Sequence, residues 1–445
     1  MEAVIFLVLY IPMASTMLKS AMDKPQAFSS FILFACLFSS TSALSDAEVS
    51  YIARRQLSAL PEDGQLNLDI DKQVGINATF ENQRLKRAYV ALQALKRAVY
   101  SDPFNITGNW VGPHVCGYTR VFCAPALDDP NLNVVAGIDL NHDDIAGYLP
   151  VELGLLNDLA LFHINSNRFC GIIPQALSKI VLMHEFDISN NRFVGPFPDV
   201  FLRWPAVKYI DIRFNDFEGE IPPEIFEKDI DALFLNDNRF TSTIPETIGK
   251  SVASIVTFAN NKFKGCIPHS IGNMSNVNQL IFINNELSGC LPGEVGMLRN
   301  LTIFDVSMNS LTGTVPESFG GLESADVLDI SHNKLSGVIP ESVCKLTSLS
   351  ILSFSHNYFS GEGSGCLRRD IEVEDGGNCL GSRPNQKSSE ECEAEVKRAV
   401  DCSKDKCSKG SSTSKPPPAK EEEVILPPNM GSRYSSPPPP MFPGY

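Results

Sequence analysis

Apolar and polar positions recur with a fixed period between Asp139 and Ser364. Most periods contain two apolar residues spaced two apart, then Asn, then Phe or Leu, then Gly and Pro, as in the run NRFCGIIP from Asn167 to Pro174. The Asn position recurs every 24 residues, shortened to 23 before two of the copies. It is held by Asp143 in an imperfect first copy and then by Asn167, Asn191, Asn215, Asn238, Asn261, Asn285, Asn309, Asn333 and Asn357. A fixed period of this size predicts ten similar units stacked one on another.

The residues of one unit have separate physical roles. Apolar residues three and five positions before the Asn, such as Phe162 and Ile164, point inward from a short strand, while the residues between them face solvent. The Asn side chain can bond peptide groups of its own turn and of the next coil. Gly allows the bend that follows, and Pro favours an extended outer segment. Because one coil cannot bury its own apolar edge, we expect an α/β repeat solenoid of ten plant-type leucine-rich repeats.

The outward positions of the strands define a concave face, which is the candidate site. From the period, this face includes Leu161, His163, Glu185, Asp187, Tyr209, Asp211, Arg213, Phe234, Asn236, Thr257, Ile281, Asp305 and Asp329. The members from Leu161 to Asn236 are the candidate peptide-binding residues, because carboxylates mixed with apolar side chains suit a basic peptide with apolar anchors. The alternative is that they form the solvated strand face that every such solenoid has.

Helical patterns precede the repeats. A capping box at Ser45 to Glu48 begins one amphipathic pattern, and a second runs from about Phe80 to Tyr100. These helices are expected to cover the apolar end of the solenoid. The expected organisation is a signal region at 1–43, a helical and disulfide-containing N-terminal cap at 44–124, the repeat solenoid at 125–364, a Cys-rich C-terminal segment at 365–407 and a Pro-rich extensin-like tail at 408–445.

Two apolar runs open the chain. The second, which ends in small residues before Ala43, has the layout of a secretory signal cleaved after Ala43. The first is explained either by an overlong start, with translation beginning at Met17 or Met22, or by a retained anchor. No later run is long enough to span a membrane, so we expect a secreted, extracellular protein.

The charge and the motifs exclude several function classes. The formal net charge of -15 argues against a nucleic-acid surface and favours cationic partners. The seven His are scattered, and the sequence has no HExxH, phosphate loop or nucleophile elbow. His163 with Glu185 and Asp187 could form an acid–base pair, yet an open concave face suits such chemistry poorly. We therefore expect no enzyme, no metal and no cofactor.

The cysteines favour an oxidising compartment. Removal of Cys36 with the signal leaves eleven, and the mature chain has no CxxC motif to favour zinc. We expect three disulfides from short spacing or shared repeat positions, namely Cys116–Cys123, Cys266–Cys290 and Cys344–Cys366. The pairing of four more stays open: Cys379, Cys392, Cys402 and Cys407. Cys170 is left alone, as a buried small hydrophobe or as an interchain link.

Four sequons predict glycosylation, at Asn77, Asn105, Asn273 and Asn300. From Ser408 the chain is rich in Lys, Ser, Glu and Pro, and we expect it to be disordered or to adopt polyproline II structure.

Several runs carry a closer resemblance. The runs 82–93, 100–105, 136–150, 160–171, 383–388 and 400–407 are similar to the leucine-rich repeat extensins of plants, and we assign the chain to the vegetative type with a truncated extensin tail. The resemblance covers about Leu44 to Cys407. The family carries a long module of Ser-Pro-Pro-Pro-Pro units with hydroxyproline that fixes it in the wall, whereas this chain has one such unit, from Ser436 to Pro440.

The resemblance implies a function and partners. Family members are cell-wall proteins whose repeat domain binds rapid alkalinization factor peptides, which are small, basic and secreted. They act in cell-wall integrity and organisation, growth and morphogenesis, alongside malectin-like receptor kinases and with pectin through the peptide, and they dimerise. Two other functions stay open: a structural cell-wall protein, and an inhibitor of a secreted polygalacturonase. Inhibitors of that kind share the repeat type but lack the long helical cap and the cysteine tail.

Overall fold

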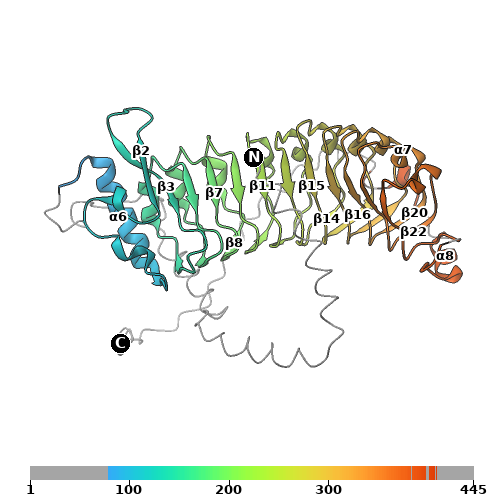
Figure 1. Ribbon diagram of the computed structural model, residues 1–445, viewed down its shortest axis with the longest axis horizontal. Coiled ribbons are helices and arrows are strands. Elements are labelled where there is room, and N and C mark those ends of the chain that lie inside the picture. The colour runs from blue at the N-terminus through green and yellow to red at the C-terminus, as the bar shows by residue number, and fades with distance from the viewer. Residues whose placement is uncertain (1–78, 382, 397–399, 406, 408–445) are drawn as a thin grey trace, which may run out of the picture. The chain divides into compact units, whose positions relative to one another are not determined.

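The computed structural model describes residues 79–381, 383–396, 400–405 and 407, which form a stack of coils (Figure 1). The chain divides into two compact units, Met1–Ser408 and Lys409–Tyr445, and the described residues all belong to the first. The signal region, the helix predicted from Ser45, the sequon at Asn77 and the Pro-rich tail lie outside the described residues. No helix within the described ranges is long and apolar enough to cross a membrane.

One parallel sheet runs along the whole stack. Its strands, in spatial order, are β2 (Val121–Pro125), β3 (Asn133–Asp139), β5 (Leu161–His163), β7 (Glu185–Asp187), β9 (Tyr209–Asp211), β11 (Ala232–Phe234), β13 (Ile255–Thr257), β15 (Gln279–Ile281), β17 (Ile303–Asp305), β19 (Val327–Asp329), β21 (Ile351–Ser353) and β23 (Glu372–Glu374). Only β2 is antiparallel to its neighbour. The exposed side of this sheet is the predicted concave face.

The Asn of each unit forms a ladder that links successive coils. Asn215 shows the pattern: its Nδ2 donates to the carbonyl of Ile188 in the previous coil at 3.0 Å, and its Oδ1 accepts from the peptide nitrogen of Phe193 at 2.9 Å. The side chain therefore satisfies peptide groups that the sheet leaves unpaired. Asn378 makes the same contacts, with the carbonyl of Phe354 and the peptide nitrogen of Phe359, so the stack continues one coil beyond the ten predicted.

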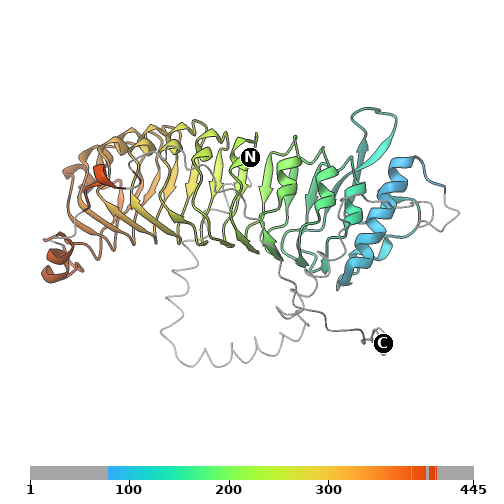
Figure 2. The same cartoon turned by 180° about the vertical axis from the view of Figure 1, so that it is seen from behind.

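A second set of strands lies on the side of the stack, and all of them except β1 follow the Asn position of a repeat. The N-terminal group consists of β1 (Val99–Ser101), β4 (Ala146–Tyr148), β6 (Arg168–Gly171), β8 (Arg192–Pro196), β10 (Asp216–Gly219) and β12 (Arg239–Phe240). The C-terminal group consists of β14 (Lys264–Gly265), β16 (Glu286–Cys290), β18 (Ser310–Gly313), β20 (Lys334–Ile339) and β22 (Tyr358–Glu362). The view from behind shows the coils from the opposite side (Figure 2).

The outer segment after each Pro is a short helical turn, 3-10 in all but one coil, and not the extended segment that we predicted. The Pro itself is extended, with φ -66° and ψ 134° at Pro174, and it is the N-cap of the helical turn that follows. These turns are η3 (Val151–Leu155), η4 (Gln175–Lys179), η5 (Asp199–Arg203), η6 (Pro223–Glu227), η7 (Glu246–Lys250), η8 (His269–Asn273), η9 (Gly293–Met297) and η10 (Glu317–Gly321), followed by α7 (Glu341–Cys344) and η11 (Ser364–Leu367). A Pro at a helix start loses no hydrogen bond, because the first N–H groups have no partner in the turn.

Aromatic rings fill much of the core between the sheet and the outer turns. Phe193, Phe217, Phe240 and Phe263 are fully buried and stack in successive coils with ring centroids 6.2–6.5 Å apart. Each coil therefore buries its apolar edge against the next, as the repeat pattern requires.

The predicted helix near Phe80 is α6 (Gln83–Ala98), which covers the first coil (Figure 1). Asn82 is its N-cap, and the Asn82 side chain accepts from the peptide nitrogens of Arg84 and Leu85. Two short turns follow it, η1 (Ile106–Asn109) and η2 (Val115–Gly117). Trp110 is fully buried and stacks on Tyr118, and the predicted Cys116–Cys123 disulfide joins η2 to β2.

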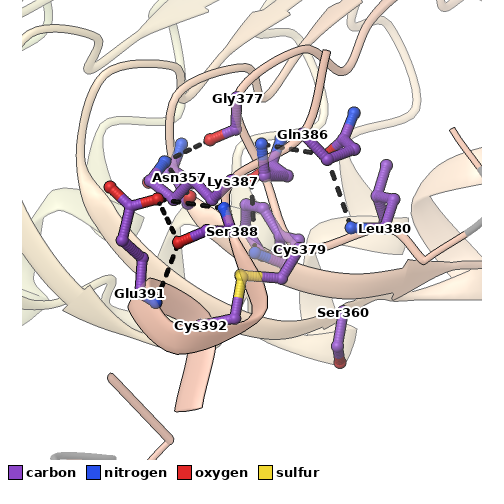
Figure 3. Close-up of a disulfide and its surroundings, with 12 residues drawn as sticks. Asn357, Ser360, Gly377, Cys379, Leu380, Gln386, Lys387, Ser388, Glu391 and Cys392 are labelled. Carbon is purple, nitrogen blue, oxygen red and sulfur yellow. Dashed lines mark hydrogen bonds between the residues drawn. A yellow bond between two sulfur atoms is a disulfide. The ribbon is translucent and has the colours of Figure 1, made fainter. Parts of the chain in front are cut away.

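The other end of the stack is closed by the Cys-rich segment. Lys387 reaches back to the carbonyl oxygen of Asn357 at 2.6 Å, and burial lowers the pKa of its ammonium group. Ser388 and Glu391 form a capping box at the start of α8 (Ser389–Val396), next to the Cys379–Cys392 disulfide (Figure 3). The predicted Cys344–Cys366 disulfide joins the last two outer turns.

The predicted Cys266–Cys290 disulfide is wrong. The structure pairs Cys266 with Cys407 and Cys290 with Cys402, so residues 402–405 and 407, which include η12 (Cys402–Lys404), lie across the side of the middle coils. Side chains at the same position of stacked coils point in parallel directions, whereas a disulfide needs Cβ atoms directed toward each other. A segment lying over both coils meets this requirement.

The returning segment also makes polar contacts with the middle coils. Asp405 accepts a hydrogen bond from the peptide nitrogen of Cys290 at 2.7 Å, and His269 bridges Glu294 and the carbonyl of Cys407. Gly289 makes room for it, since a Cβ at that position would lie 2.2 Å from the sulfur of Cys407.

Cys170 is a buried free thiol, as one of the two predicted alternatives requires. Its sulfur lies 3.7 Å from the hydroxyl of Tyr100 and 3.5 Å from the carbonyl oxygen of Gly147, and burial raises the pKa of the thiol.

Candidate functional site

The strands of this sheet make the concave face mostly acidic. Alternation turns every second side chain, such as Phe162, Phe186 and Ile210, into the core, where each is nearly or fully buried. The strands of the twelve-stranded sheet contain no lysine or arginine. Their carboxylates are Asp139, Glu185, Asp187, Asp211, Asp305, Asp329, Glu372 and Glu374. The face is therefore acidic along most of its length.

The register brings the predicted site residues into two columns across β5, β7, β9 and β11. Leu161, Glu185 and Tyr209 are partners in one column, which Ala232 continues. His163, Asp187, Asp211 and Phe234 are partners in the other. His163 Nε2 lies 3.4 Å from Glu185 Oε2, so neighbouring rungs of the two columns also interact.

Asp211 and Phe234 lie in these columns but are buried, with exposed fractions of 0% and 5%, although we expected both to contact solvent. Arg213 lies against both: its Nε is 2.9 Å from Asp211 Oδ2, and its guanidinium carbon is 4.9 Å from the Phe234 ring centroid. Tyr209 donates to Asp211 Oδ2 at 3.2 Å, and the rings of Tyr209 and Phe234 are 5.5 Å apart. The side chains of Arg213 and Tyr209 thus shield the Asp211 carboxylate and the Phe234 ring from solvent.

Burial changes the chemistry of this cluster. It raises the pKa of Asp211 to about 7, because the charged form loses hydration; Arg213 opposes that rise, and Asp187 adds to it. Burial also raises the pKa of the Tyr209 hydroxyl. Asp211 is therefore a buried partner of Arg213 and Tyr209, and the exposed charge at this end of the face comes from Glu185 and Asp187.

The other strand aspartates support their own turns. Asp187 Oδ1 accepts from the peptide nitrogen of Ser189 at 2.9 Å and from its hydroxyl at 2.6 Å. Asp305 Oδ1 makes the same pair of contacts with Ser307, at 2.8 Å and 2.6 Å. In both residues Oδ2 takes no part in these bonds, so each carboxylate supports its turn through a single oxygen.

A second acidic group lies in the C-terminal half of the face. Asp305 and Asp329 are partners on β17 and β19, and burial together with their mutual repulsion raises the pKa of Asp305 to about 6. Apolar side chains lie between the two acidic groups, among them Ile255 on β13 and Ile281 on β15. The face is thus acidic, then apolar, then acidic along the stack.

Phe122 is an exposed residue of the concave face that the repeat period does not predict. Phe122 on β2 is 54% exposed and lies beside Gly137, where an added Cβ would be 3.5 Å from the Cβ of Phe122. The antiparallel strand β2 precedes the first repeat, so the 24-residue period does not identify it.

The described sequons lie away from the strands of the concave face. Asn105, Asn273 and Asn300 are exposed, and the last two belong to or follow the outer turns η8 and η9. Within the described residues, no group of His, Cys, Asp or Glu is arranged to hold a metal ion.

Comparisons with known proteins place this architecture in a family. The family model described as "Leucine rich repeat" matches residues 299–359. The chain is 67% identical over 402 residues to pollen-specific leucine-rich repeat extensin-like protein 4 of Arabidopsis thaliana, covering 88% of this chain and 58% of that protein. It is 69% identical over 402 residues to pollen-specific leucine-rich repeat extensin-like protein 1 of the same plant, covering 88% and 42%. The chain therefore spans about half the length of these relatives.

The relatives that match over most of the chain carry pollen-specific names, whereas we assigned the chain to the vegetative type. A relative without the word pollen-specific in its name, leucine-rich repeat extensin-like protein 3, is 58% identical over 237 residues.

Among solved structures, the leucine-rich repeat ectodomain of the Arabidopsis receptor kinase HAESA, in complex with an extended IDA peptide hormone, superposes with a TM-score of 0.57 at 25% identity. That match covers 66% of this chain and 50% of the other. A TDR receptor structure superposes with a TM-score of 0.52 at 28% identity, covering 55% and 43%. The repeat period, the helical and disulfide-bonded caps and the identity to these relatives agree, and the chain belongs to the plant leucine-rich repeat extensin family.

Proposed function

We propose that this protein is a secreted, extracellular protein of the plant cell wall that binds small basic signalling peptides of the rapid alkalinization factor type on its concave face. Binding would place it in cell-wall integrity, growth and morphogenesis, next to malectin-like receptor kinases and, through the peptide, pectin. The proposal includes glycosylation of the exposed sequons, a homodimeric state and no enzymatic activity.

One observation carries the proposal: the twelve strands supply carboxylates and not one lysine or arginine, while apolar side chains lie between the two acidic groups. A basic peptide can pair its cations with this face and bury apolar residues at its centre. The fold supports the same reading, because the HAESA ectodomain that superposes on it is described in complex with a peptide hormone.

The two other candidate functions predict different surfaces. A structural wall protein does not need an acidic concave face, because its extensin module would carry out the structural role. An inhibitor of a polygalacturonase would bind a large folded enzyme. Neither of these two functions requires a concave face on which apolar side chains lie between two acidic groups.

The test is the binding of a synthetic, oxidatively folded rapid alkalinization factor peptide to the full secreted chain, followed by calorimetry and by association kinetics at two salt concentrations. We expect tight binding that weakens as salt rises, because exposed charges guide the approach. Absence of binding at micromolar peptide would overturn the proposal.

A matched pair of double variants locates the site. Glu185→Gln with Asp187→Asn removes two charges from the concave face, whereas Glu224→Gln with Glu246→Gln removes two exposed charges from the outer turns η6 and η7. The first pair should slow association several-fold and reduce its salt dependence, and the second should leave both unchanged. Equal effects of the two pairs would mean that only the net charge of the protein matters.

A further inference from the structure

A column of left-handed residues borders the concave face. In the nine coils from Asn167 to Asn357 the residue just before the ladder Asn has φ between 52° and 56°, and these residues form the rim column: Ser166, Asn190, Phe214, Asp237, Asn260, Asn284, Met308, His332 and His356. Asn, Asp and Ser suit this conformation because their short polar side chains bond locally, whereas bulky apolar side chains disfavour it.

The polar members of the rim column contact one another from coil to coil. Asn190 donates to the hydroxyl of Ser166 at 3.0 Å. Asn260 donates to Asp237 at 2.8 Å, and Asn284 donates to Asn260 at 2.9 Å. The imidazole rings of His332 and His356 stack with centroids 4.2 Å apart. The rim residues therefore contact each other wherever two polar members are neighbours in the column.

Two apolar residues interrupt these contacts. Phe214 and Met308 have φ of 53° and 54°, and their side chains are 49% and 48% exposed. Phe214 takes part in none of the ring contacts found among the described residues. Two bulky apolar side chains are thus held in a disfavoured backbone conformation without being buried, which stability alone does not explain.

Both interruptions fall on coils that carry a concave aspartate. Phe214 follows Asp211 on the coil of β9, and Met308 follows Asp305 on the coil of β17. These strands are four rungs apart, since β11, β13 and β15 lie between them. At about 4.8 Å per rung, the two apolar side chains are about 19 Å apart along the rim. That distance equals about six residues of extended chain.

We propose that Phe214 and Met308 are two apolar contact points for one extended segment of the bound basic peptide, which crosses the rungs from β9 to β17. This inference rests on the proposed function and adds the path that the peptide follows across the strands and the spacing of its apolar residues. The segment carries apolar residues about six positions apart, with Lys or Arg between them facing Asp187, Asp305 and Asp329. Charge decides the occupant: a second copy of this face would bring like charges together, whereas a cationic peptide neutralises them.

The test replaces each of the two apolar rim residues by Asn, the residue type that occurs most often in the rim column. Phe214→Asn and Met308→Asn relieve the left-handed strain and restore a polar rung, so each variant should melt at the same temperature as the parent or higher. Each should nevertheless weaken binding of the synthetic rapid alkalinization factor peptide about tenfold, mainly through faster dissociation. Met297→Asn is the control, because Met297 is 62% exposed on the outer turn η9, and it should change neither property.

The outcomes separate this inference from the proposed function. If the parent chain fails to bind the peptide, the proposed function fails. If the parent binds and the charge variants on β7 weaken binding, while both rim variants raise the melting temperature and bind normally, the path along the rim is wrong and the function stands. Loss of binding in the control variant as well would also contradict the rim assignment.

Discussion

Asp211→Asn should flatten the dependence of stability on pH. The Asp211 carboxyl is fully buried beside Arg213 and Tyr209, and burial raises its pKa to about 7, against about 3.9 in an unfolded chain. A carboxyl whose pKa is raised by folding binds its proton more tightly in the folded state. Its contribution to stability is therefore largest at low pH and is lost as pH rises toward 7.

The magnitude follows from these two values. Between pH 5.5 and pH 7.5 the linkage relation gives a loss of about 2 kcal/mol of unfolding free energy from this one group. Asn cannot ionise and keeps the shape of the carboxyl group, so the variant should lack this component. Asp305 has its pKa raised in the same direction and remains in both proteins, so the difference between them isolates Asp211.

The assay is urea denaturation of the disulfide-intact chain at pH 5.5, 6.5 and 7.5, for the parent, Asp211→Asn and the control Glu224→Gln. The parent and the control should lose stability as pH rises, and Asp211→Asn should lose about 2 kcal/mol less. Parallel slopes for all three proteins would refute the assignment of a buried carboxyl that titrates near neutral pH. Such parallel slopes are the result expected if Arg213 holds the carboxyl fully ionised, because a carboxylate that is ionised in both the folded and the unfolded chain adds no pH dependence in this range.

Three further outcomes are expected. Peptide mapping without reduction should recover a Cys266–Cys407 peptide, and recovery of a Cys266–Cys290 peptide would contradict this connectivity. Cys266→Ser with Cys407→Ser should lower the unfolding free energy by about 3–5 kcal/mol, because the disulfide closes a long loop. A chain that ends at Ser408 should melt at the same temperature as the mature chain, since the tail composition cannot bury enough apolar area to offset its ordering; a drop of several degrees would be inconsistent with that. Tyr209→Ala should hasten peptide dissociation at a cost of about 2 kcal/mol, and unchanged dissociation would remove Tyr209 from the site.

The fold was readable from the sequence because the repeat imposes it. The 24-residue period fixes which side chains enter the core, and the Asn at its end must bond the neighbouring coil, as Asn215 does. The register of the candidate site followed from the same period, so Asp211 and Phe234 lie opposite each other as expected.

The remaining features depend on contacts that the period does not encode. The burial of Asp211 depends on Arg213, whose side chain turns back over the face and covers Phe234 as well. The disulfides to Cys402 and Cys407 depend on a return path of the chain, and cysteine spacing does not encode such a path. The eleventh coil, ended by Asn378, lacks the spacing of Gly and Pro that marked most of the other copies.

The most direct test of peptide binding on the concave face is photo-cross-linking. A synthetic rapid alkalinization factor peptide with a photoreactive apolar residue is bound to the full chain, irradiated and digested, and the cross-linked fragments are identified by mass spectrometry. We expect cross-links to fragments that contain the concave strands and the rim column between β7 and β19, and excess unlabelled peptide should suppress them. Competable cross-links confined to the outer turns η3 to η10, or to the returning segment 402–407, would contradict it.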